Sequence, residues 1–401
     1  MASSSFHLCV LFLFASLLIP TICHGSPDDD HMALFIFGDS LFDAGNNNYI
    51  NTNTSYRANF WPYGETTFNY PTGRFSDGRL IPDFIAEYAK LPLIPPYKQP
   101  GNHQFINGVN FASGGAGALV QTHRGMVIDF KTQLSYFKDV ERLLRQQLGD
   151  KEAKKLLTRA VYLVSIGSND YIFPLVTNSS FFQSYSQEEY VEMVIGNITV
   201  VIEEIYKKGG RKFGFISSPP LGCLPGMRSV KPGNSSDCME ELNAIVKLHN
   251  HALSQVLQKQ ERQLKGFIYS NFDSYTSFSE RMGNPSRYGM LRVYDYLLRS
   301  KKIEKRISHE NYKILTYIIC CEGFEEAKSA CCGSGPFRGV YSCGGKRGVK
   351  EYQLCDNASA YLFFDSVHPT EIANQQFAKL MWNGTSNIAW PYNLKALFGL
   401  T

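Results

Sequence analysis

The chain has 401 residues, of which 44% are hydrophobic and 19% are charged, a composition that allows one or two domains with a sizeable buried core. It carries 40 lysines and arginines against 36 aspartates and glutamates, and this net charge of +4 gives no indication of a nucleic-acid-binding protein. Aromatic residues make up 13%, which suits either an apolar substrate wall or an ordinary aromatic core.

The N-terminal residues have the pattern of a secretory signal peptide. Cys9–Pro20 is an apolar run too short to span a membrane, and Cys23 and Gly25 are small residues at the spacing that a signal peptidase accepts. No Lys or Arg precedes the run. We expect a signal peptide over residues 1–25 and a single domain over residues 26–401. No later stretch has 18 apolar residues, so we expect a soluble secreted protein without a transmembrane segment.

Cysteines and glycosylation sequons agree with secretion. Of the 10 cysteines, Cys9 and Cys23 lie in the expected signal peptide, which leaves an even number for disulfides. Zinc binding is less favoured, because Cys331 and Cys332 are adjacent and no C-x-x-C pair repeats. The possible glycosylation sites are Asn53, Asn178, Asn197, Asn234, Asn357 and Asn383.

Six of these cysteines fall into two groups along the chain. Cys223 and Cys238 flank a loop rich in proline and glycine, and we expect them to pair. The second group would supply two further bridges, but four cysteines allow three connectivities and the sequence does not choose among them. This group comprises Cys331, Cys332, Cys343 and Cys355.

A short apolar run, Ala33–Phe37, predicts a buried parallel strand. Gly38-Asp39-Ser40 follows and turns the chain at the carboxyl end of that strand, where open α/β sheets bind ligands. The Ser40 hydroxyl would then lie at the mouth of a crevice. Alternatively, Asp39 and Ser40 merely cap a following helix. The choice depends on whether a histidine, an acid and oxyanion donors occur elsewhere.

The next part of the chain combines a helix, a connector and a glycine-rich stretch. A helix is expected over Leu80–Lys90, and Leu91–Pro100 is an extended connector. Gly108–Gly117 fits a short strand that enters a glycine-rich loop. Such a loop could cradle a phosphate, but neither G-x-G-x-x-G nor a Walker lysine is present. The alternative is that its backbone N–H groups face an oxyanion.

Strands and helices then alternate, which implies right-handed crossovers and a parallel sheet. One of these strands ends in Gly167-Ser168-Asn169-Asp170, a second polar turn at a strand's carboxyl end. The expected helices are Phe130–Gln147, Tyr190–Lys208 and Cys238–Leu264, and the expected strands are Ala160–Ile166, Phe213–Ser217 and Gly266–Ser270.

The C-terminal part supplies a histidine and an acid. The apolar run Tyr361–Phe364 leads into Asp365 and His368, and Pro369 is expected to open a helix that runs to about Trp382. Across such a turn, the carboxylate can accept from one imidazole nitrogen and leave the other free as a base. The alternative is that Asp365 caps the helix and His368 is incidental.

Together these segments resemble the four blocks of the GDSL esterase/lipase family, within the SGNH hydrolases. Gly38-Asp39-Ser40-Leu41 matches the nucleophile block, Gly115 the glycine block, Gly167-Ser168-Asn169-Asp170 the G-x-N-D block and Asp365-Ser366-Val367-His368 the D-x-x-H block. The strings FIFGDSLFDAGNNNY, YPTGRFSDGR, GVNFASGGAG and DSVHPTE are similar to the plant branch, nearest its secreted GDSL lipases.

The resemblance implies a role for each matched residue. Ser40 would be the nucleophile, His368 its general base and later acid, and Asp365 the group that holds the imidazole in the right tautomer. The backbone N–H groups of Ser40 and Gly115 and the side-chain amide of Asn169 would form the oxyanion hole. The implied fold is a flavodoxin-like three-layer α/β/α sandwich with a five-stranded parallel sheet. No G-x-S-x-G occurs, so an α/β-hydrolase is not supported.

The function expected from this resemblance is a secreted serine carboxylester hydrolase of the apoplast or cell wall. It would cleave lipid or other acyl esters through an acyl-enzyme. Defence and lipid breakdown are both compatible roles, and no protein partner is identified. The alternative is a catalytically weak, GDSL-like associated or binding protein in plant defence. Every catalytic position is filled in this chain, which favours the enzyme.

No metal or organic cofactor is implied by the remaining polar residues. His249 and His251 lie two apart on an expected helix, so their side chains diverge and we interpret them as structural. His103 and His123 have no acid at a suitable spacing. Asp39 is interpreted as a structural hydrogen-bonding partner rather than a second base.

One segment, Met290–Gly323, departs from the family, because relatives run almost directly from the asparagine-proline turn at Asn284 to a phenylalanine, here Phe324. The segment adds Cys320 and Cys321 to a cysteine set that is even without them. It is either a substrate lid or partner surface, since long loops often carry function, or an insertion foreign to the family, such as a retained intron in the gene model. We favour the second interpretation.

Overall fold

The computed structural model describes residues 32–101, 104–177, 184–231, 237–288 and 323–400. The residues within these ranges belong to a single compact unit. The expected signal peptide, the sequons at Asn178 and Asn234, and residues 290–322 lie outside the described residues. Expectations about these segments therefore remain predictions.

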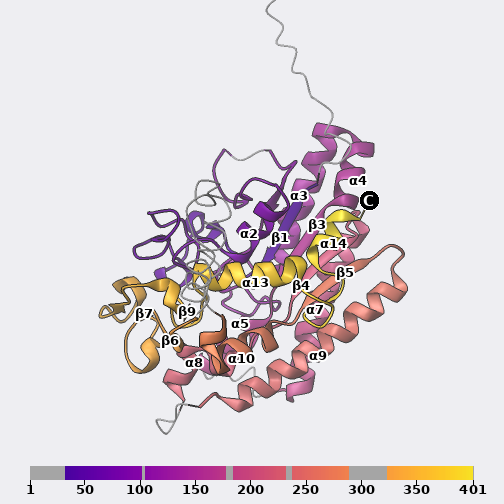
Figure 1. The fold of residues 1–401 in the computed structure, drawn as a ribbon. Helices are drawn as coiled ribbons and strands as arrows, with labels where there is room; N and C mark the ends of the chain where they lie inside the picture. Colours follow the sequence, from indigo (N-terminus) through magenta and orange to yellow (C-terminus); the bar gives the residue numbers. More distant parts are fainter. Residues whose placement is uncertain (1–31, 102–103, 178–183, 232–236, 289–322, 401) are drawn as a thin grey trace, which may run out of the picture. The chain divides into compact units, whose positions relative to one another are not determined.

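A six-stranded sheet has the spatial order β10-β5-β4-β3-β1-β2 (Figure 1). Strands β1 to β5 are parallel, in the order 2-1-3-4-5 of flavodoxin-like folds, which confirms the expected five-stranded parallel arrangement. The sequence did not indicate β10, which pairs antiparallel with β5 and adds an edge strand. The bounds are β1 Leu34–Gly38, β2 Gly108–Asn110, β3 Val161–Ser165, β4 Lys212–Ile216, β5 Ile268–Phe272 and β10 Ala389–Pro391.

Helices cover both faces of this sheet. Tyr162 of β3 packs against Phe137 of α3, with 5.7 Å between ring centroids. The next residue, Leu163, is paired in register with Gly214 of β4, and a Cβ at Gly214 would meet the side chains of both Leu163 and Leu394 of α14. Because successive strand residues point to opposite faces, α3 and α14 flank the sheet on opposite sides. The architecture is therefore the expected three-layer α/β/α sandwich.

Two groups of helices form the outer layers. Helices α3, α7 and α9 pack in succession, as do α2, α13 and α14. None of the helices in the described ranges is long and apolar enough to cross a membrane. The bounds are α2 Ile81–Tyr88, α3 Phe130–Leu148, α4 Asp150–Arg159, α5 Ser168–Thr177, α7 Gln187–Lys207, α8 Pro225–Val230, α9 Glu240–Gln263, α10 Ser274–Gly283, α13 Glu371–Asn383 and α14 Leu394–Gly399.

Some element boundaries differ from the expectations. Gly167-Ser168-Asn169-Asp170 is not a free turn, because α5 begins at Ser168. Pro369 does not open the C-terminal helix. Thr370 is its N-cap, with a side chain that accepts from the Ala373 N–H, and the helix begins at Glu371. Helix α4 was not expected, because Gly149 interrupts the helical pattern just before it.

Two small sheets and three disulfides complete the C-terminal part. Strand β6 (Glu326–Ala330) pairs in parallel with β9 (Tyr361–Phe363), and β7 (Cys332–Gly333) pairs antiparallel with β8 (Gln353–Leu354). The expected Cys223–Cys238 disulfide is present. The second cysteine group forms Cys331–Cys355 and Cys332–Cys343, which settles the connectivity that the sequence left open.

Candidate active site

The turn that presents Ser40 is fixed from three sides. Gly38 closes β1 with φ +152°, and a Cβ there would lie 2.3 Å from the Ser165 carbonyl oxygen, so only glycine fits. The Gln133 side chain of α3 bonds both the N–H and the carbonyl of Gly38, at 2.9 and 2.8 Å. The Asp39 N–H donates to the Ser165 carbonyl of neighbouring β3 at 3.1 Å. Ser40 therefore lies at the carboxyl edge of the sheet.

Asp39 serves the turn itself, as the sequence suggested. Its carboxylate accepts from the Leu41 N–H at 3.0 Å, and its carbonyl accepts from the N–H groups of Phe42 and Asp43. Burial raises the pKa of Asp39 to about 7, against the opposing effect of the Leu41 N–H. No α-helix follows this turn; a 3-10 segment, Asn46–Tyr49, comes next. The alternative that Asp39 and Ser40 merely cap a helix is therefore wrong.

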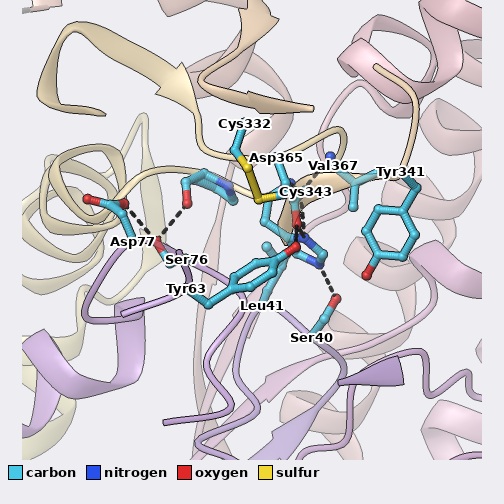
Figure 2. A network of polar contacts seen from close by, with 12 residues as sticks. Ser40, Leu41, Tyr63, Ser76, Asp77, Cys332, Tyr341, Cys343, Asp365 and Val367 are labelled. Carbon is cyan, nitrogen blue, oxygen red and sulfur yellow. Dashed lines mark hydrogen bonds and ion pairs between the residues drawn. A yellow bond between two sulfur atoms is a disulfide. The ribbon is translucent and has the colours of Figure 1, made fainter. Parts of the chain in front are cut away.

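Ser40, His368 and Asp365 form one hydrogen-bonded chain (Figure 2). The His368 Nε2 atom lies 2.7 Å from Ser40 Oγ, and His368 Nδ1 lies 2.7 and 2.8 Å from the two carboxylate oxygens of Asp365. Asp365 is fully buried, yet it also accepts the N–H groups of Val367 and His368 at 3.0 and 2.9 Å. The chain has the geometry by which an acid orients an imidazole toward a serine hydroxyl.

The pKa of Asp365 reflects this setting. Burial raises the pKa, but the charge and hydrogen bond of His368, the Arg347 charge and the Tyr63 hydroxyl outweigh burial and lower it to about 2. The carboxylate is therefore ionised at neutral and mildly acid pH. An ionised carboxylate accepts the Nδ1 proton and leaves Nε2 as the free basic atom.

Ser40 and Gly115 line one cavity, and each carries a backbone N–H group. Within the described ranges, no group accepts from the N–H of Ser40 or of Gly115. The Asn47 side chain donates to the Gly114 carbonyl at 2.8 Å, and Asp43 accepts from the Gly114 N–H at 2.8 Å. The Gly114 carbonyl and the Gly115 N–H belong to the same peptide group. Because the N–H and carbonyl of a trans peptide point in opposite directions, the hydrogen bond from Asn47 to this carbonyl orients the Gly115 N–H away from Asn47.

Asn169 lies on the first turn of α5 and also lines the cavity. Its amide nitrogen donates one hydrogen to the Ala116 carbonyl at 2.9 Å, so the second hydrogen is available to another acceptor. Neighbouring Asp170 accepts the N–H groups of Ala118 and Leu119 at 2.7 and 3.0 Å, which ties α5 to the glycine-rich loop. Burial raises the pKa of Asp170 to about 6.

A cavity of about 540 Å³ opens at these residues. Ser40, Gly115, Asn169 and His368 all line it, so the structure brings together the residues that the sequence singled out. Most of its remaining wall is apolar and comes from α5, α8, α10 and the segment before α8. These residues include Ile172, Phe173, Leu221, Leu224, Met227 and Phe278. No sequence pattern indicates this wall, because its members are scattered over separate elements.

The other histidines do not form a metal site in the parts that the structure describes. His249 is fully buried, its Nδ1 lies 2.8 Å from the Tyr171 hydroxyl, and burial lowers its pKa to about 4. His251 is exposed. The one cluster in the described residues with metal-like spacing is Cys223, Cys238 and Glu240, and its two sulfurs form a disulfide. His103 lies outside the described residues.

His123, which has no acid at a suitable spacing in the sequence, lines the cavity. Its Nδ1 lies 2.7 Å from the Gly115 carbonyl oxygen. A carbonyl can only accept, so Nδ1 carries the proton and Nε2 is an acceptor. Burial lowers the pKa of His123, which favours this neutral form. His123 thus adds one polar side chain to the cavity wall near the glycine-rich loop.

Comparison with known proteins agrees with this geometry. The family model for GDSL-like Lipase/Acylhydrolase matches residues 34–381. GDSL esterase/lipase 1 of Arabidopsis thaliana is 52% identical over 92% of this chain and 90% of its own length. GDSL lipase of Tanacetum cinerariifolium is 49% identical over 97% and 93%, respectively. GDSL esterase/lipase 4 of Arabidopsis thaliana is 46% identical over 100% of both chains. The chain therefore belongs to the GDSL-like lipase/acylhydrolase family.

Proposed function

We propose that this protein is a secreted serine carboxylester hydrolase that forms an acyl-enzyme on Ser40. Membership of a family whose relatives are named esterase/lipases makes the protein a carboxylic ester hydrolase. The observation that carries the proposed mechanism is the hydrogen-bonded chain from Ser40 through His368 to buried Asp365, at the mouth of an apolar cavity.

In the proposed reaction, Ser40 Oγ attacks the ester carbonyl carbon while His368 Nε2 takes its proton. Asp365 stays ionised and stabilises the imidazolium that forms. The N–H groups of Ser40 and Gly115 and the Asn169 amide stabilise the negative oxygen of the tetrahedral intermediate. His368 then gives its proton to the departing alkoxide, and an acyl ester of Ser40 remains. Water, activated by His368, releases the carboxylic acid by the same steps.

The cavity supports an acyl or similarly apolar substrate group. Its apolar walls remove hydrocarbon from water, which contributes about 0.8 kcal/mol for each buried CH₂ group. Its polar lining includes Ser40, Asn169 and His368, against which the ester would lie. The proposed substrates are therefore esters with an aliphatic or aromatic acyl group rather than small charged esters.

A chromogenic ester series tests this function. Wild-type protein is expected to hydrolyse p-nitrophenyl esters, with kcat/KM rising from acetyl to medium-length acyl chains. Ser40→Ala should lower kcat by a factor of about 10⁶, the scale seen when a serine triad loses its nucleophile, without changing the melting temperature by more than a few degrees. Hydrolysis by Ser40→Ala at the wild-type rate would contradict the proposal. No hydrolysis by folded wild-type protein on any ester would instead favour the binding-protein alternative.

Secretion is part of the same proposal. It is supported by the signal-peptide pattern at residues 1–25 and by the three disulfides, which persist in oxidising compartments. The sequons that the structure describes, at Asn53, Asn197, Asn357 and Asn383, are all exposed, as glycan attachment requires. Sequencing the N-terminus of protein recovered from the extracellular fluid should give Ser26, and retention of Met1 would contradict it.

A further inference from the structure

We propose that Tyr63 and Arg347 are positioning residues for the reaction, because together they hold the second carboxylate oxygen of Asp365. This inference rests on the proposed function, since it assigns a role in supporting the hydrogen-bonded chain of Ser40, His368 and Asp365. Neither residue belongs to the four sequence blocks that indicate the triad. They come from distant parts of the chain and meet only in the folded structure.

The direction of each hydrogen bond is fixed by chemistry. The Tyr63 hydroxyl lies 2.7 Å from Asp365 Oδ2, and Figure 2 shows the two groups directed at each other. The Arg347 Nη1 atom lies 2.9 Å from the same hydroxyl oxygen. A guanidinium only donates, so the Tyr63 oxygen accepts a hydrogen bond from Arg347 and its hydroxyl donates one to Asp365. The donors run in one sense, from Arg347 through Tyr63 to the carboxylate.

The hydrogen bonds from Arg347 through Tyr63 to Asp365 lie in the interior, where interactions between charges are strongest. Tyr63 is fully buried and Arg347 is 4% exposed. No carboxylate contacts the Arg347 guanidinium in the described ranges. Its other partners there are the carbonyls of Cys343 and Arg57, at 3.1 and 3.0 Å, and the aromatic rings of Phe60, Tyr63 and Tyr341. The Arg347 charge is therefore coupled to that of Asp365 through the Tyr63 hydroxyl, in surroundings of low dielectric constant.

The Tyr63 hydroxyl completes the set of hydrogen-bond donors around the Asp365 carboxylate. Oδ1 accepts the N–H groups of Val367 and His368, which lie on the same turn as the carboxylate. His368 Nδ1 is within reach of both oxygens, so these local bonds leave the carboxylate plane only partly defined. A donor on Oδ2 fixes that plane, and with it the direction of the imidazole toward Ser40. It also stabilises the carboxylate when His368 becomes charged.

The fold anchors Arg347 to the turn after β9 that carries Asp365. Arg347 donates to the carbonyl of Cys343, and Cys343 is bonded through sulfur to Cys332. The Cys332 N–H in turn donates to the carbonyl of Phe364, the residue before Asp365, at 2.7 Å. The disulfide thus links the loop of Arg347 to the triad, and Figure 2 shows it beside Asp365.

Kinetics of three variants test the proposal. Tyr63→Phe keeps the ring and removes the hydroxyl, and we expect kcat for a p-nitrophenyl ester to fall about 10- to 100-fold, the scale of a lost hydrogen bond to a buried charge. KM should change less than about threefold, because neither residue lines the cavity. Arg347→Met should lower kcat by a similar factor, and Arg347→Lys should restore part of the loss because it keeps the charge.

Tyr162→Phe is the matched control. Tyr162 is another fully buried tyrosine, whose hydroxyl donates to the Leu157 carbonyl at 2.8 Å, remote from the cavity. Its loss should lower the melting temperature without lowering kcat. In proton NMR, the His368 Nδ1–H resonance, assigned by its disappearance in His368→Ala, should move in Tyr63→Phe and stay in place in Tyr162→Phe.

The outcomes separate this inference from the proposed function. If ester hydrolysis depends on Ser40 but Tyr63→Phe retains the kcat and the NMR resonance of the wild type, the positioning role is overturned and the hydrolase stands. If Ser40→Ala retains hydrolysis, the proposed function fails first. Should Arg347→Met fail to fold, Tyr63→Phe decides alone, because its ring still fills the same space.

Discussion

Asn169 is held in the cavity wall by its own hydrogen bond and by those of Asp170, the next residue. Its amide donates to the Ala116 carbonyl, and Asp170 next to it accepts two N–H groups of the glycine-rich loop. On the other side, Asn47 fixes the peptide that carries the Gly115 N–H. Donors that are already oriented stabilise a developing oxyanion without a further cost of reorganisation. The proposed oxyanion hole is thus built from residues that the surrounding loop positions in advance.

Replacing Asn169 by alanine tests its place in that hole. Asn169→Ala should lower kcat about 10²–10³-fold and leave KM almost unchanged, because an oxyanion donor acts mainly in the transition state. Steady-state kinetics on a p-nitrophenyl ester measures both constants. The control is Asn393→Ala. Asn393 is the N-cap of α14, and its side-chain amide donates to the backbone carbonyl of Gly384. Equal kcat for Asn169→Ala and the wild type would remove Asn169 from the proposed site.

Among the elements, the segments with a clear period were predictable and the short ones were not. The apolar runs that became β1, β3 and β4 are fully buried, so their composition alone indicates strands. Strand β10 has three residues, includes Pro391 and pairs only at the sheet edge, so no local pattern marks it. The boundary error at Pro369 arises from capping, because the Thr370 side chain decides which residue begins the helix.

The described residues on either side of residues 289–322 lie close together. The Phe324 N–H donates to the Pro285 carbonyl at 3.0 Å, and Gly323 lies directly against the backbone of Ser286. Phe324 is 2% exposed and belongs to the hydrophobic core. A direct connection across this point therefore requires little change in the flanking backbone, as expected of an insertion that the fold does not need.

Deletion of the segment tests that interpretation. Joining Gly289 to Phe324 should give a secreted protein with wild-type kcat/KM and a melting temperature within a few degrees of the full chain. The measurements are ester kinetics and thermal unfolding of the purified proteins. A variant that is secreted and folded but inactive would show that the segment contributes to the site, as a lid or a partner surface would.

At the scale of the whole molecule, the site is assembled from parts that lie far apart in the sequence. The bond between Ser40 and His368 spans 328 residues, and those from Tyr63 to Asp365 and to Arg347 span 302 and 284. The triad was accessible from the sequence because its members sit in recognisable blocks. Tyr63 and Arg347 sit in none, and no local pattern relates residues so distant. Only the fold brings Tyr63 to Asp365 and Arg347 to Tyr63.

The central claim is that Ser40 is the nucleophile, and covalent trapping tests it most directly. A fluorophosphonate ester should add one phosphonyl group to the wild-type protein, and peptide mapping by mass spectrometry should find it on Ser40, with loss of ester hydrolysis in proportion to labelling. Folded Ser40→Ala should take up no label. Stoichiometric labelling at another residue, or full hydrolytic activity in a protein whose Ser40 is completely phosphonylated, would contradict the account.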